Sequence, residues 1–170
     1  MSEPERAYPG ELWIVNGGRY GVYRVVRRRD GREIGHAVAW REAVLMAARA
    51  VSPELADIAL YWIHSDPGEC AVLVRGLHVF VSGLVVWEGR REQYAVESER
   101  SPGCYYAVQR NRGSGLWNCS CPEFELSGCH DIMFTVWGRS QLVCKHILGV
   151  WFTYLYRGAE EGSGYGMATA

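Results

Sequence analysis

The chain has almost no lysine and no long apolar segment. Of its 18 basic residues only Lys145 is a lysine, and the formal net charge is −1, so the chain as a whole is not a polycation. No run of eighteen apolar residues occurs, so no membrane-spanning helix is predicted. The first ten residues, MSEPERAYPG, carry acids and prolines and lack the apolar core of a secretory signal. We therefore expect an intracellular protein of the cytoplasm, nucleoid or nucleus, without a membrane partner.

Familiar catalytic motifs are also missing. The sequence contains no phosphate-binding loop, no nucleophile elbow and no HExxH. The adjacent His130 and Asp131 could serve as a base and its orienting acid, but such a pair in a loop is more often solvated or packed. We expect the chain not to be an enzyme and to have no small-molecule substrate.

The amino-terminal half predicts an α+β arrangement. With 48% apolar residues the chain can build a real core. Asp30-Gly31 between two β-rich runs is a strong hairpin signal, and the apolar spacing of AWREAVLMAARAV favours a helix that ends at Ser52-Pro53. Residues 55–65 fit a helix or a strand equally. An antiparallel sheet with one or two helices is expected, with strands at 12–15, 20–28 and 33–39 and two or three more between 70 and 98.

The best candidate for a domain boundary is the polar stretch 97–103, which contains Ser101-Pro102-Gly103. Beyond it, CYYAVQR and GLWNCS can pair as a hairpin, and an apolar stripe predicts a helix from Gln141 to a stop at Arg157-Gly158. The Gly-rich end lacks a core-forming pattern. The expected units are an α+β region over 1–100, a small module over 101–158 and a flexible tail over 159–170.

Two Cys/His pairs lie within this module. Cys119 and Cys121 enclose one serine, and after 22 residues Cys144 and His146 enclose Lys145. In an intracellular chain such paired spacing points to metal rather than to disulfides. Tetrahedral zinc places two sulfur ligands about 3.8 Å apart, which a turn at the end of a strand permits. The prediction is one zinc ion with four protein ligands, a closed structural site that contributes folding energy.

The pattern resembles the SWIM zinc finger, CxC…CxH. Trp117 precedes the first pair, Pro122 and Phe124 follow it, and CKHILGV opens a helix. The resemblance covers about residues 104–156 and implies a ββα fold with one structural zinc. It also implies a role in DNA binding or protein–protein interaction, and family members include proteins that accompany recombinase paralogues.

The segment between the pairs departs from this pattern. Cys129 and His130 stand where a shorter finger would place its second pair, so a ligand set that borrows one of them is an alternative. Adjacent residues in extended chain point to opposite sides, which disfavours that set. Residues 132–137 predict an inserted strand or packed loop. Cys70 and Cys104 remain as a possible disulfide.

Two binding hypotheses follow. One is an accessory protein in DNA recombination or repair that works through a protein partner such as a recombinase-like ATPase, since the seven tryptophans and ten tyrosines could anchor an interface. The other is direct DNA binding, as in a transcription regulator or transposition-related protein, through an arginine-rich hairpin at residues 24–32 and the zinc finger. The plainer interpretation of the arginines on this hairpin is a solvated surface. The candidate nucleic-acid-binding residues are Arg24, Arg27, Arg28, Arg29, Arg32, Arg110, Arg112 and Lys145.

Overall fold

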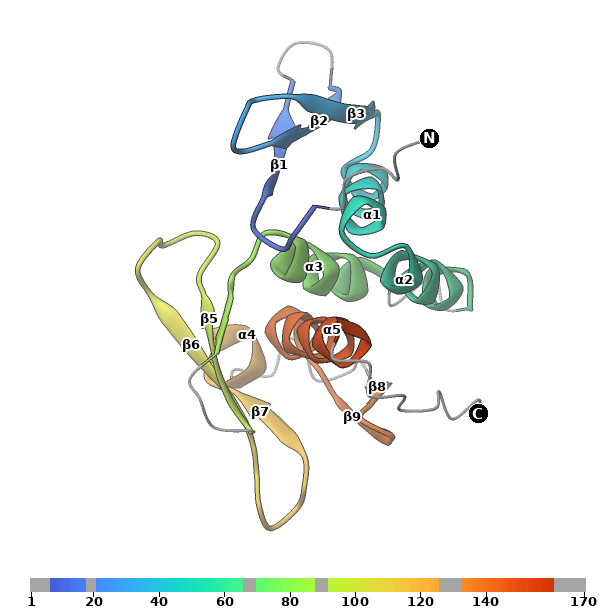
Figure 1. Cartoon of the computed structure of the whole chain (residues 1–170). Coiled ribbons are helices and arrows are strands. Elements are labelled where there is room, and N and C mark those ends of the chain that lie inside the picture. The colour runs from blue at the N-terminus through green and yellow to red at the C-terminus, as the bar shows by residue number, and fades with distance from the viewer. Residues whose placement is uncertain (1–6, 18–20, 66–69, 88–91, 126–132, 161–170) are drawn as a thin grey trace.

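The computed structural model describes residues 7–17, 21–65, 70–87, 92–125 and 133–160. The fold is mixed α+β with antiparallel sheets (Figure 1). No helix in these ranges is long and apolar enough to cross a membrane. The strands are β1 (Leu12–Asn16), β2 (Tyr23–Arg27), β3 (Glu33–Ala37), β4 (Val85–Trp87), β5 (Gln93–Glu97), β6 (Tyr105–Arg110), β7 (Trp117–Cys119), β8 (Met133–Val136) and β9 (Arg139–Leu142). The helices are α1 (Trp40–Val51), α2 (Pro53–Ser65), α3 (Cys70–Val81), α4 (Pro122–Glu125) and α5 (Lys145–Glu160).

The first sheet has the order β1-β2-β3 and is antiparallel throughout. The predicted hairpin is confirmed: Gly31 has a φ of 68°, and its N–H donates to the carbonyl of Arg27 at 2.9 Å. A register shift between Val25 and Val26 lies in the central strand. Val25 is fully buried where this sheet meets α1, so one face of the sheet contributes to the core.

Three helices follow, where one or two were predicted. α1 matches the predicted span, and the ambiguous segment is the helix α2. The prediction of a strand after residue 70 is wrong, because 70–81 form α3. Its four valines favour β structure locally, but α1 and α2 cover one side of this helix and α5 covers the other. Burial on both sides removes the amphipathic stripe by which a helix is usually recognised.

The second sheet has the order β4-β5-β6-β7. Its β6–β7 pair is the predicted hairpin, with Gln109 opposite Asn118. β5 pairs with β6 from Gln93↔Gln109 to Glu97↔Tyr105, so this sheet continues across the predicted boundary near residue 100. The division of the chain into separate units therefore stays a prediction.

β8 and β9 form a hairpin before α5, which places a strand within the predicted insertion. Pairing of β9 with β8 extends to Leu142, so the helix begins at Lys145 rather than at Gln141. The helix continues through Gly158 to Glu160, past its predicted stop, and 161–170 of the predicted tail lie outside the described residues.

α3 and α5 pack side by side in the centre of the molecule (Figure 1). Two glycines make this close approach possible. A Cβ built on Gly76 would lie 2.4 Å from the Cβ of Leu148, and a Cβ on Gly149 would lie 2.5 Å from a methyl carbon of Val79. The first turn of α5 is thereby fixed against the amino-terminal helices.

Candidate metal centre

The first cysteine pair lies at the end of the β6–β7 hairpin. Cys119 is the last residue of β7. The N–H of Ser120 donates to the carbonyl of Ala107 at 3.0 Å, and the N–H of Ala107 donates to Oγ of Ser120 at 2.9 Å. The carbonyl of Cys121 accepts the N–H of Phe124 at 3.0 Å as α4 begins. The chain thus turns between the two cysteines, and the small serine is held by the neighbouring strand.

The second pair lies at the beginning of α5. The carbonyl of Cys144 accepts the N–H of Leu148 at 3.1 Å, so Cys144 occupies the N-cap position. His146 follows within the first turn, and its ring lies against Tyr106 with the ring centroids 4.8 Å apart. This contact positions the imidazole from the side of the β6 strand.

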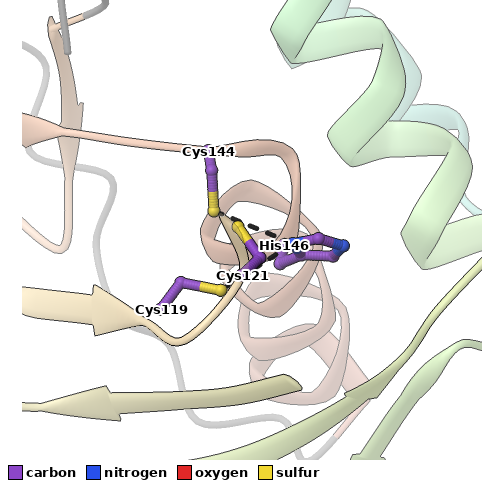
Figure 2. A group of neighbouring side chains, drawn as sticks. All are labelled: Cys119, Cys121, Cys144 and His146. Atoms are coloured by element: carbon purple, nitrogen blue, oxygen red, sulfur yellow. Dashed lines mark hydrogen bonds between the residues drawn. The ribbon is translucent and has the colours of Figure 1, made fainter. Parts of the chain in front are cut away.

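The four side chains converge on one point (Figure 2). One ligand atom from each lies within 4.8 Å of the others. Nδ1 of His146 is 3.7 Å from Sγ of Cys119 and 4.0 Å from Sγ of Cys144. Tetrahedral zinc would place sulfur and nitrogen ligands about 3.6 Å apart. All four residues are buried, with at most 4% of their surface exposed, so the cluster can hold a metal ion shielded from solvent.

The crowded thiols restrict one another's ionisation. Hydrogen bonds to Cys121 and Cys144, together with burial, raise the pKa of Cys119 far above its usual range. The hydrogen bond with Cys119 acts to lower the pKa of Cys144, but contact with Cys121 and burial outweigh it and raise that pKa to about 12. Hydrogen bonds from Cys119 and Cys144 lower the pKa of Cys121. Three thiolates at this spacing therefore require a neighbouring cation, which is the role of a bound metal ion.

A polar cluster joins the centre to the helices. Lys145, between two of the candidate ligands, donates a hydrogen bond to Glu99, and Nδ1 of His78 on α3 donates to the same carboxylate at 2.8 Å. The ring of Trp40 on α1 contacts His78 edge-on at 5.3 Å. Burial acts to raise the pKa of Glu99, but the hydrogen bonds from His78 and Lys145 prevail and lower it to about 2. This carboxylate therefore stabilises the start of α5 in its ionised form.

The structure brings together the four residues predicted as metal ligands. The alternative that uses Cys129 or His130 lies outside the described residues and remains open. Cys70 and Cys104 are free thiols, so they do not form a disulfide in this structure.

The candidate nucleic-acid-binding residues do not form one surface. The arginines of the β2–β3 hairpin and those of the β6–β7 hairpin lie toward opposite ends of the molecule (Figure 1). Arg24 is 3.8 Å from Glu33, and Arg110 donates to Glu92 at 2.8 Å. Lys145 is only 14% exposed in its side chain because it contacts Glu99. Arg28 lies over the ring of Trp13 at 4.9 Å from the centroid.

Sequence reasoning missed a pocket beside the metal centre. Its lining residues come from five strands, three turns and α5, and no local spacing connects them. The lining residues are Glu92, Tyr94, Arg110, Gly115, Trp117, Val136, Trp137, Arg139, Gln141 and Tyr154. Of these, only Arg110 and Trp117 had been connected with binding or with the zinc motif, and the abundance of aromatic residues was the one signal available.

The chain matches no protein-family model, no curated protein and no solved structure in the comparisons made. The SWIM resemblance therefore rests on the motif residues, and the geometry shows a Cys₃His cluster able to hold a metal ion.

Proposed function

We propose that the chain is a zinc-stabilised accessory protein, without catalytic activity of its own, that acts in DNA recombination or repair through a protein partner. The observation that carries the proposal is the buried Cys119, Cys121, Cys144, His146 cluster. Three sulfurs and one imidazole nitrogen are a usual donor set for structural zinc. The same residues carry the resemblance to the SWIM finger, from which the recombinase-like ATPase partner is taken.

A structural role for the ion follows from its ligands. Four protein ligands fill a tetrahedral site, whereas a catalytic zinc keeps one position for water or substrate. Each ligand is at least 96% buried, which leaves little access to a substrate. The ion would fasten the β6–β7 hairpin to the first turn of α5, and its binding energy would become folding energy.

The surface offers apolar groups to a partner. Trp13 on β1 is 52% exposed, Ile34 on β3 is 39% exposed, and Val38 just beyond it is 77% exposed. Aromatic and aliphatic side chains of this size commonly anchor protein interfaces. We assign the partner-binding surface to the three-stranded sheet, away from the metal centre.

The test is recovery of the full-length, metal-loaded chain from its native host after nuclease treatment. A co-purifying recombinase-like ATPase supports the proposal. Trp13→Ser should reduce its capture, whereas Tyr61→Ser, which alters an exposed aromatic residue on α2, should not. Loss of every partner after nuclease treatment, or nuclease activity that follows the pure chain, contradicts the proposal.

Direct DNA binding remains the second candidate, favoured by the exposed arginines of the β2–β3 hairpin and the contact of Arg28 with Trp13. A planar guanidinium suits both phosphate and aromatic faces. This function predicts an affinity for duplex DNA that falls steeply with salt.

A further inference from the structure

A pocket of about 200 Å³ lies between the β5–β7 strands, the β8–β9 hairpin and α5. It is separate from the buried ligand cluster, since none of the four candidate metal ligands lines it. Three features of its wall point to the same kind of ligand.

The first feature is a pair of converging cations. Gly115 has a φ of 71°, and a Cβ there would lie 2.8 Å from Nη1 of Arg139 and 3.4 Å from Nη2 of Arg110. Nη1 of Arg139 donates to the carbonyl of Ser114 at 2.9 Å, and Nη1 of Arg110 donates to Glu92 at 2.8 Å. The pocket lining therefore holds two guanidinium groups and one carboxylate, and this excess of positive charge favours an anion that guanidinium groups can bind through paired hydrogen bonds.

The second feature is a tryptophan held in an unfavourable backbone conformation. Trp137 and Gly138 form the two-residue loop between the paired Val136 and Arg139, with φ values of 49° and 72°. Such a loop favours asparagine, aspartate or glycine at its first position, and among the described residues Trp137 alone is a non-glycine with positive φ. Its indole stacks on Trp117 with the centroids 4.2 Å apart and the planes 18° apart. Strain of this kind is often retained at binding sites.

The third feature is an unsatisfied amide. Oε1 of Gln141 accepts the N–H of Trp117 at 2.9 Å, which leaves its Nε2 as a donor. That nitrogen is buried and has no hydrogen-bond partner within the described part of the chain, although Gln141 lines the pocket. Buried donors are normally satisfied, so the pocket wall favours a ligand that brings an acceptor.

We propose that this pocket binds one nucleotide unit of a single-stranded nucleic acid. The base stacks on the half-buried Trp137, an acceptor on its edge meets the amide of Gln141, and the phosphate lies at Arg110 and Arg139. A base supplies a flat face and edge acceptors together, and its phosphate supplies the anion. The ring of a phenylalanine or tryptophan side chain would offer the flat face without an acceptor on its edge. Duplex DNA hides its base faces in the stack.

The test uses the full-length, metal-loaded chain and a fluorescent oligodeoxythymidine of about ten nucleotides, within the length range that small single-strand-binding domains cover. Trp137→Asn removes the ring that stacks on Trp117 but places in the loop a residue that accepts positive φ, which offsets part of the lost packing, so the thermal unfolding of the variant is measured beside its binding. We expect its affinity to fall about tenfold or more. Arg139→Gln should weaken binding and lower the salt slope by about one. Arg41→Gln, which alters an exposed arginine on α1 that does not line the pocket, is the matched control and should change neither.

Competition experiments identify the ligand. A duplex of equal length and free thymidine monophosphate should compete weakly against the labelled strand. Unchanged binding by Trp137→Asn, equal affinity for the duplex, or equal affinity for the free nucleotide overturns the proposal. Stronger competition by a peptide that ends in phenylalanine overturns it in favour of a protein partner. Capture of an ATPase partner is measured separately, so the proposal for this pocket and the proposed accessory function can be refuted independently of each other.

Discussion

Replacing Gly76 with alanine tests whether the metal centre depends on the packing of α3 against α5. The added Cβ would lie 2.4 Å from the Cβ of Leu148 and 3.2 Å from the carbonyl oxygen of Lys145. Carbon atoms in contact normally lie about 3.5–4.0 Å apart. Neither neighbouring atom can rotate away, because one is a backbone oxygen and the other is fixed to the backbone of α5. The two helices must therefore separate by about 1 Å to reach that contact distance.

The magnitude follows from two opposing terms. Overpacking of a core costs about 1–3 kcal/mol, and this contact belongs at the upper end. Alanine in place of glycine within a helix returns up to about 1 kcal/mol. The net loss of unfolding free energy is then about 2 kcal/mol, or about 4–8 °C in melting temperature for a chain of this length.

The assay is thermal and denaturant unfolding of the metal-loaded chain, with metal release to a chelator followed in parallel. Gly76→Ala should also release metal more readily, because the displaced turn carries His146. Gly158→Ala is the control, since a Cβ there meets nothing within 4 Å, and it should be neutral or stabilising by up to about 1 kcal/mol. A Gly76→Ala chain that melts with the parent and keeps its metal refutes the reasoning.

Three further predictions concern the centre and the charged surfaces. Cys144→Ser should lose metal and much of its folded structure, because structural zinc supplies about 10–16 kcal/mol in finger peptides. The control Cys104→Ser, at an exposed cysteine, should change the free energy of unfolding by less than about 0.5 kcal/mol. Equal metal loss in both variants would contradict the ligand set. Glu99→Gln should cost about 1–2 kcal/mol at pH 7, discounted for solvent screening. Its depressed pKa means that this contribution is complete above the unfolded value of 4.5 and disappears as the pH falls toward 2, so the variant and parent should converge in acid unfolding curves; a constant difference would assign the effect to packing. Neutralising the arginines at 27–29 together should flatten the salt dependence of duplex DNA binding by about one unit per lost phosphate contact, and an unchanged slope would leave them as solvated surface.

The sequence predicted those features that depend on residues close together in the chain. The hairpin at Asp30-Gly31 needs only a residue that accepts positive φ, and Gly31 has it. The four candidate metal ligands were found because two pairs with one intervening residue each are visible in the sequence. The structure adds what spacing cannot show, namely that the turn at Ser120 and the N-cap position of Cys144 bring both pairs to one point.

Features that depend on distant contacts were missed. α3 contains β-favouring valines, and only its burial between other helices and α5 makes it a helix. The pocket at Trp137 joins residues as far apart as Glu92 and Tyr154. Its strained loop follows from strand pairing, since the sequence Trp-Gly carries no strong hairpin signal of its own.

X-ray absorption spectroscopy of the chain purified without added metal tests the central claim most directly. The account predicts one zinc per chain, bound by three sulfurs at about 2.3 Å and one nitrogen at about 2.0–2.1 Å. Cys144→Ser should abolish this signature, and Cys104→Ser should preserve it. Absence of metal, or a coordination shell dominated by oxygen and nitrogen, would contradict a centre built from Cys119, Cys121, Cys144 and His146.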